Sequence, residues 1–132
     1  MFFTTILVIT TTLFASRPIP QSPEALTATV ETAFANADIE IARIIAVPED
    51  QRTFQNTIGA LDDMMVRLDG ASNIPAFMAY VHTDAGIREA AQGAAQLWSD
   101  WSIDFATNVD LYNAIKAFED TNPGLTGEQA RM

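Results

Sequence analysis

The residues of this chain with the clearest chemical potential are carboxylates. Asp100 and Asp104 stand four residues apart, with Asp110 close behind. Carboxylates one helical turn apart can hold a metal ion or act as an acid and base pair. A di-metal helical bundle, however, needs a Glu followed three residues later by a His on each of two helices, and the sequence lacks that pattern. We therefore interpret these residues as a solvated acidic face, and an independent enzyme that uses Asp100 and Asp104 is the weaker alternative.

The remaining reactive groups do not complete a catalytic site. A zinc hydrolase needs two histidines one helical turn apart and a third ligand, but His82 is the single histidine. There is no cysteine, no glycine-rich phosphate loop and no nucleophile-elbow pattern around a serine. We interpret His82 as a surface or capping residue, and Asp62 and Asp63 as exposed helical surface. The prediction is that this chain contains no catalytic, cofactor-binding or metal-binding residue.

Three aromatic residues could stack on a ligand, but their spacing favours a role in packing. Between residues 84 and 108, apolar positions recur at steps of four and three, which keeps one side of an α-helix facing a partner. The stripe consists of Ile87, Ala91, Ala94, Trp98, Trp101 and Phe105. Aromatic residues at helical spacing usually belong to a core. A long central helix is therefore predicted here, and a stacking platform is the alternative.

Four further helices are expected around the central one. The first begins at its N-cap Ser22 and ends before Pro48; the second follows a Thr53 cap; a short third covers 74–81 after a turn at 70–73; the last starts at an Asp110 cap. The expected buried residues are Leu26, Val30, Ala33, Phe34, Ala37, Ile41, Ile44 and Ile45 in the first, Ile58, Leu61, Met65 and Leu68 in the second, Phe77, Met78 and Val81 in the third, and Leu111, Ile115 and Phe118 in the last. The pattern predicts an all-α fold, an antiparallel layer or bundle of about five helices.

The two ends of the sequence carry separate expectations. Thr126 to Gln129 has the form of a capping box, so we expect a chain truncated at the start of a sixth helix. Residues 18–132 are predicted to form one helical domain. Residues 1–17 contain an apolar run that is shorter than the roughly 20 residues needed to span a bilayer. We expect either a signal peptide, which would make the protein periplasmic or secreted, or an apolar segment that is disordered or packs elsewhere in a longer protein, which would leave the protein cytoplasmic.

The charge balance excludes two classes of partner. Asp and Glu number 17 against 7 Lys and Arg, which gives a formal charge of -10. This field repels a phosphate backbone, and the single lysine, Lys116, cannot form a polybasic run for an anionic membrane. We expect no nucleic acid partner and no stable membrane span. The 48% of hydrophobic residues is enough to form a core.

Four segments together resemble a known enzyme family. They are TFQNTI at 53–58 followed by Leu61, IREA at 87–90, NVDLYNAI at 108–115 and LTGEQAR at 125–131. In order and approximate spacing they are similar to the N-terminal helical region of the thimet oligopeptidase and oligopeptidase A family of zinc metallopeptidases. The resemblance covers about residues 22–132. It implies a large helical enzyme that cleaves short peptides, whose N-terminal region forms one wall of a deep channel and whose later catalytic domain supplies a His-Glu-x-x-His zinc site.

None of the family's catalytic or zinc-binding residues has a counterpart in this sequence. The resemblance therefore implies a channel-wall portion that is inactive alone, with zinc in the full-length protein, the catalytic domain of the same polypeptide as its partner and short peptides as substrate. A surface that meets such a partner should be apolar and exposed. The predicted patch is formed by Phe34, Ile45, Phe54, Tyr80 and Tyr112. The alternative function is a free-standing acidic helical interaction module with an apolar groove.

Overall fold

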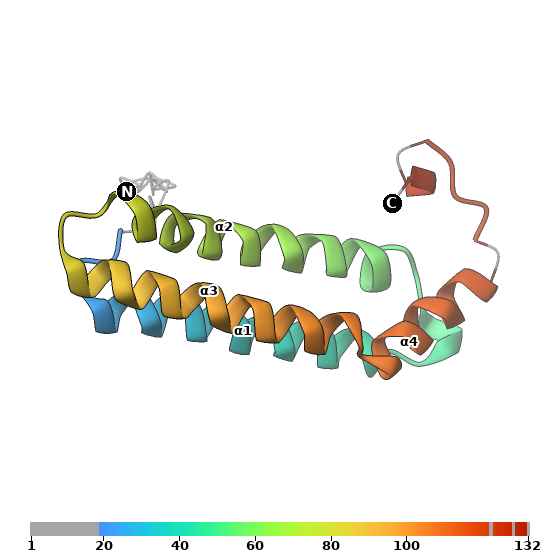
Figure 1. The fold of residues 1–132 in the computed structure, drawn as a ribbon. Coiled ribbons are helices and arrows are strands. Elements are labelled where there is room, and N and C mark those ends of the chain that lie inside the picture. The colour runs from blue at the N-terminus through green and yellow to red at the C-terminus, as the bar shows by residue number, and fades with distance from the viewer. Residues whose placement is uncertain (1–18, 122, 128, 132) are drawn as a thin grey trace, which may run out of the picture.

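The computed structural model describes residues 19–121, 123–127 and 129–131, and these residues are helical without a strand. The four α-helices are α1 (Pro23–Ile45), α2 (Ala60–Val81), α3 (Ala85–Ala106) and α4 (Val109–Asp120). Short turns of other helical types are η1 (Glu49–Gln51), η2 (Gln55–Gly59) and η3 (Gln129–Arg131). Helices α1, α2 and α3 run side by side in alternating directions, and α4 lies across the end of the bundle where α3 finishes (Figure 1). The predicted all-α, antiparallel class is confirmed, with four α-helices in place of about five.

Helix α1 begins and buries its apolar stripe as the sequence predicts. The Ser22 hydroxyl accepts a hydrogen bond from the Ala25 N–H at 3.2 Å, and Pro23 occupies the first turn. The Glu24 carboxylate accepts hydrogen bonds from its own backbone N–H and from Ser22, which lowers the pKa of Glu24 below its ordinary value of 4.5. The buried residues are Leu26, Val30, Phe34, Ala37, Ile41 and Ile44. Ala33 and Ile45 are half-buried at the margin of the same stripe.

A π-helical turn precedes α2 and changes which of its residues are buried. Thr53 caps this turn reciprocally with Asn56: the Asn56 N–H donates to Thr53 Oγ1 at 3.2 Å, and the Thr53 N–H donates to Asn56 Oδ1 at 2.8 Å. The Gly59 N–H then bonds to the Phe54 carbonyl at 2.8 Å, five residues back. This wider turn contains one residue more than an α-helical turn, so it rotates the residues that follow. Thr57 is fully buried in it, whereas the predicted Ile58 is half-buried.

Helix α2 is one continuous element, and the predicted turn at 70–73 with a separate helix at 74–81 is wrong. Pro75 lies inside the helix and is buried. The Ser72 hydroxyl donates to the Leu68 carbonyl at 3.1 Å, and the Asn73 amide donates to the Asp69 carboxylate at 2.8 Å, so these polar residues bond within the helix. Met64, Leu68, Pro75 and Met78 form one buried stripe along it. Packing of this stripe on α1 and α3 outweighs the local signals for a break.

Two corrections follow for the buried residues expected in this region. Leu61 and Met65 are half-buried, and Met64 takes the central place because of the phase change at the π turn. Phe77 and Val81, which were expected to be buried, are 65% and 54% exposed, since a helix continued from Ala60 directs them away from α1 and α3. Leu68 and Met78 are buried as predicted.

Helices α3 and α4 carry the expected apolar faces. Asp84 caps α3 by accepting a hydrogen bond from the Ile87 N–H at 3.1 Å. Ile87, Ala91 and Ala94 are buried, and Trp98, Trp101 and Phe105 are half-buried against the core. In α4, Leu111, Ala114 and Phe118 are buried and Ile115 is half-buried.

The predicted cap of α4 is displaced by two residues. Asn108, not Asp110, caps this helix: Asn108 Oδ1 accepts a hydrogen bond from the Leu111 N–H at 2.9 Å. Asp110 instead lies exposed in the first turn, where its negative charge still favours the helix dipole. Asparagine and aspartate are both favoured caps, so the choice depends on where the chain leaves α3.

The structure describes the residues after α4 in part, and it does not describe the N-terminal residues 1–18. After α4, Gly124 and Gly127 adopt positive φ angles of 60° and 64°, and η3 (Gln129–Arg131) is a short helical turn near the end of the described residues. The predicted signal peptide or apolar segment at 1–17 falls outside the described residues. Among the helices that the structure describes, none combines the length and apolarity required to cross a bilayer.

Candidate functional site

His82 belongs to the connection between α2 and α3. Its backbone N–H donates to the Met78 carbonyl at 3.1 Å, and its ring Nδ1 accepts from the Asp84 N–H at 3.1 Å. The ring therefore helps to hold the turn that starts α3. This arrangement fits the capping role that the sequence suggests for His82.

The acidic residues singled out in the sequence do not form a metal site. Asp100 accepts a hydrogen bond from the Gln96 amide at 2.8 Å along the exposed side of α3, while Asp104 lies one turn further on and is also exposed. Asp62 and Asp63 are exposed in the first turn of α2. No cluster of three or more His, Cys, Asp or Glu side chains able to hold a metal ion occurs among the residues that the structure describes. The described part of the chain therefore does not fit a zinc site.

The aromatic residues of α3 form a cluster with Phe34 of α1. The ring of Trp101 stacks on Phe34, with centroids 5.6 Å apart, and on Phe105, with centroids 5.1 Å apart and planes 14° apart. Trp98 lies against the same group, 5.9 Å from Trp101. The Trp101 indole N–H donates to Asp38 Oδ1 at 2.8 Å, which joins α3 to α1 across 63 residues. The main role of these aromatic residues is to pack α3 against α1, as their helical spacing predicts.

An open groove runs beside these rings between α1 and α3. It encloses about 320 Å³ and combines carboxylates with aromatic and aliphatic side chains. The residues that line it are Asp38, Ile41, Ala42, Ile45, Trp101, Asp104, Phe105 and Asn108. Asp104 therefore lines the same groove as Asp38 of α1, whereas Asp100, one turn earlier on α3, does not line it. Sequence spacing cannot reveal this pairing because the two residues lie on different helices.

Two arginines that the sequence analysis did not single out close the ends of helices. The Arg52 guanidinium donates to the carbonyls of Ile44 and Ile45 at 2.9 and 3.0 Å, in the last turn of α1. Carbonyl groups in the last turn of a helix lack partners within it and attract positive charge. Arg52 thereby fixes the turn between α1 and η2. Its Nε is buried and has no hydrogen-bond partner among the described residues.

Arg88 performs the same task at the other end of the bundle. Its Nη1 donates to the carbonyls of His82 and Thr83 at 2.7 and 2.9 Å, directly after α2 ends. The signal for both arginines was present in the sequence, because each lies in or beside a segment that carries the family resemblance. The resemblance assigns these two residues no structural role, and the geometry shows that each holds backbone carbonyls at or just beyond a helix end.

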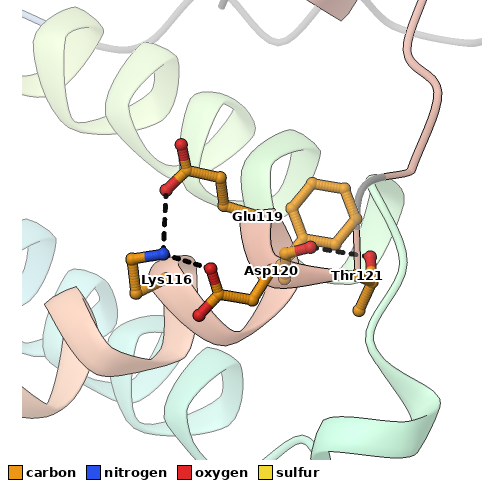
Figure 2. A network of polar contacts seen from close by, with 5 residues as sticks. Lys116, Glu119, Asp120 and Thr121 are labelled. Carbon is orange, nitrogen blue, oxygen red and sulfur yellow. Dashed lines mark hydrogen bonds and ion pairs between the residues drawn. The ribbon is translucent and has the colours of Figure 1, made fainter.

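The last turn of α4 holds a surface ion-pair network that joins Lys116 to the carboxylates of Asp120 and Glu119 (Figure 2). The hydrogen bond to Asp120 is the main cause that raises the pKa of Lys116 above its ordinary value of 10.5. The Thr121 hydroxyl donates to the Phe118 carbonyl at 2.7 Å and closes the helix. Such exposed pairs contribute little to stability, and this network ends a helix rather than forming a reactive site.

Two of the five residues predicted for an exposed apolar patch are exposed, but Tyr80 lies in the last turn of α2 whereas Tyr112 lies in α4, which contacts η2 before the start of α2, so they do not form one patch. Tyr80 is 87% exposed and Tyr112 is 64% exposed. Phe34 is 8% exposed, so its assignment to the exposed patch was wrong and its assignment to the buried stripe of the first helix was right: the side chain is held in the core by its stack on Trp101. Phe54 and Ile45 are half-buried. The exposed apolar side chains of α2 are instead Val66, Ile74, Phe77, Tyr80 and Val81.

Comparison with known proteins gives one informative relative. No protein-family model matches the chain. Over 95 residues the chain is 30% identical to a thimet-like oligopeptidase of Dictyostelium discoideum, and the match covers 72% of this chain and 14% of that protein. The chain is similar to a peptidase. The similarity supports the family relationship that the four sequence segments suggest, and the chain spans a small share of the relative's length.

Proposed function

We propose that this chain is the N-terminal, channel-wall portion of a zinc-dependent metallopeptidase that cleaves oligopeptides. The observation that carries the proposal is the 30% identity to a thimet-like oligopeptidase over 72% of the chain. In this proposal the chain is inactive alone. It docks on a catalytic domain of the same polypeptide, which contributes zinc and the peptide-cleaving residues, and short peptides are the substrate of the whole enzyme.

The positions of the resembling segments support a shared helical scaffold. In the first segment Thr53 caps the π turn and Thr57 is fully buried within it. In the second, Ile87 is buried at the start of α3. In the third, Asn108 caps α4 and Leu111 is buried. These residues lie where the connecting turns meet the helices and fix the start of each helix. A relative that has the same segments can therefore form the same helix starts.

Zinc would have to be held by residues other than those described here. The single histidine serves the α2 to α3 connection, and the described carboxylates form no ligand group of three. For this reason no chemical step is assigned to any residue of this chain. In the proposal, this chain contributes a rigid helical wall beside an active site that the catalytic domain supplies.

The coding sequence downstream of the Met132 codon tests the proposal directly. The expected result is an open reading frame that encodes a His-Glu-x-x-His motif within the following several hundred codons. The corresponding whole gene product should cleave a quenched fluorogenic oligopeptide and lose that activity with a zinc chelator. An open frame of that length without the motif would exclude the proposal.

A second function is favoured by one specific observation, the exposed apolar side chains of α2. Phe77, Tyr80 and Val81 are 65%, 87% and 54% exposed near the end of this helix, which suits a free-standing acidic interaction module. The two functions differ in how residues 18–132 behave alone. A monomer in sedimentation that melts cooperatively in calorimetry supports the module, whereas a molten, self-associating product supports the channel-wall portion.

A further inference from the structure

The groove between α1 and α3 combines a concave surface, aromatic rings and negative charge. Its volume of about 320 Å³ lies between the two helices, and Ala42 contributes only a methyl group to its lining. A space of this size accommodates a small organic group. Neither the family relationship nor the proposed channel-wall function assigns a role to it.

One wall of the groove is the end of an aromatic stack. Trp101 is stacked between two rings, Phe34 and Phe105. Phe105 has Trp101 as its one aromatic neighbour among the described residues, so the second face of its ring is not stacked on another ring. The faces of aromatic rings are electronegative and attract cations.

Two carboxylates from different helices complete the groove. Asp38 of α1 is oriented by the Trp101 indole N–H at 2.8 Å. The Asp104 carboxylate of α3 has neither a hydrogen bond nor an ion pair with any described residue. The described lining residues include no Lys or Arg that could neutralise the pair. The groove is therefore a concave site with uncompensated negative charge next to an aromatic surface.

We propose that this groove binds an organic cation, a guanidinium or primary ammonium group. A planar guanidinium can lie against an aromatic ring and donate hydrogen bonds to carboxylates at the same time. A metal ion is a poorer fit, since two carboxylates and the Asn108 amide, whose oxygen already accepts from the Leu111 N–H, leave most of its coordination positions unfilled. The group can come from a free small cation or from an arginine or lysine side chain of a peptide. The inference rests on the groove alone and does not depend on the proposed peptidase function.

Tryptophan fluorescence provides the measurement, because both tryptophans, Trp98 and Trp101, belong to the cluster beside the groove. The whole chain is titrated with ethylguanidinium, with Nα-acetyl-arginine amide and with Nα-acetyl-citrulline amide, at constant ionic strength. Citrulline has nearly the shape of arginine without its charge. We expect saturable changes for both guanidinium compounds, with dissociation constants on the order of 1 mM, as suits an open site, and none for citrulline. If the arginine amide binds more than tenfold tighter than ethylguanidinium, the site accepts a peptide side chain; similar affinities indicate a site for free small cations.

Two carboxylate variants separate the groove from the general negative field of the protein. Asp104→Asn removes a groove carboxylate, and Asp100→Asn removes the same charge one turn earlier on α3, outside the groove. Asp104→Asn should weaken binding about fivefold, whereas Asp100→Asn should change it less than twofold. Phe105→Leu should also weaken binding while retaining an apolar side chain. Circular dichroism melting checks that each variant is folded.

Three results would overturn the inference. These are the absence of a saturable fluorescence change, an equal response to the citrulline compound, and equal weakening by the two asparagine variants. The last result would mean that the formal charge of -10 attracts cations without a defined site.

Discussion

Replacing Arg52 with methionine should lower the stability of the bundle by about 2 kcal/mol. The arginine donates two charge-assisted hydrogen bonds, to the Ile44 and Ile45 carbonyls, each worth about 1.5 kcal/mol. The same substitution also removes the buried Nε donor, which has no hydrogen-bond partner. Losing this unsatisfied donor stabilises the folded state by about 1 kcal/mol and offsets part of the loss. Methionine preserves an apolar stem of similar length, so the packing loss is small. For a chain of this size the loss corresponds to a fall in Tm of about 8 °C.

Urea denaturation followed by circular dichroism measures this difference, and Arg43→Met is the matched control. Arg43 pairs with Glu40 on the exposed surface of α1, so its loss should cost less than about 0.5 kcal/mol. Arg52→Lys should fall between the two, since it keeps a charge near the helix end but cannot reach both carbonyls with one fork. Equal destabilisation by the Arg52 and Arg43 methionine variants would refute the assigned capping role.

Three further expectations concern helix ends, a helix interior and alkaline pH. Asn108→Ala should cost about 1 kcal/mol and Asp110→Ala less than about half of that in urea denaturation, because Asn108 is the cap. Gly93→Ala should raise stability by about 0.8 kcal/mol, since apart from its chain neighbours and the adjoining backbone of α3 no atom lies within 4 Å of the added Cβ, whereas Gly86→Ala should gain less because Pro23 lies 3.2 Å from it. The raised pKa of Lys116 gives a stability contribution that is present below pH 10.5 and lost as pH rises through the folded-state value; Lys116→Met should remove this part of the alkaline transition.

The helices whose ends and buried faces are set by local sequence signals were predictable. Helix α1 has a Ser-Pro start and a complete apolar stripe, and both appear in the structure as expected. The stripe of α3 was also predicted, including its change from alanines to aromatic residues. In these two helices the capping residues and the hydrophobic periodicity favour the same structure, so packing against neighbouring helices does not change the helix bounds or the buried face.

Helix α2 shows where local signals are insufficient. Glycine, serine, asparagine and proline between residues 70 and 75 indicate a turn. The helix continues because Leu68, Pro75 and Met78 share one face that packs on two other helices. The π turn at Gln55–Gly59 likewise changes the buried register, and its extra residue leaves no separate mark in the hydrophobic pattern.

The groove was only partly accessible to sequence reasoning. Asp104, Trp101 and Phe105 were recognised as chemically capable, and their shared helix was correct. Their partner Asp38 lies 63 residues from Trp101, so no spacing pattern connects the two. The crossing of α1 and α3 decides which carboxylate meets which ring, and no periodicity within one helix contains that information.

The sequence by itself determined the helical class, the acidic charge, the main apolar stripes and the resemblance to a peptidase family. These properties follow from composition, from residue types at helical spacing and from short segments, all of which are local. The tertiary structure decided that α2 is one helix, that Arg52 and Arg88 close the ends of α1 and α2, and that Asp38 and Asp104 face one groove. Each of these features depends on contacts between distant residues, whose free energy appears only when the three long helices pack together.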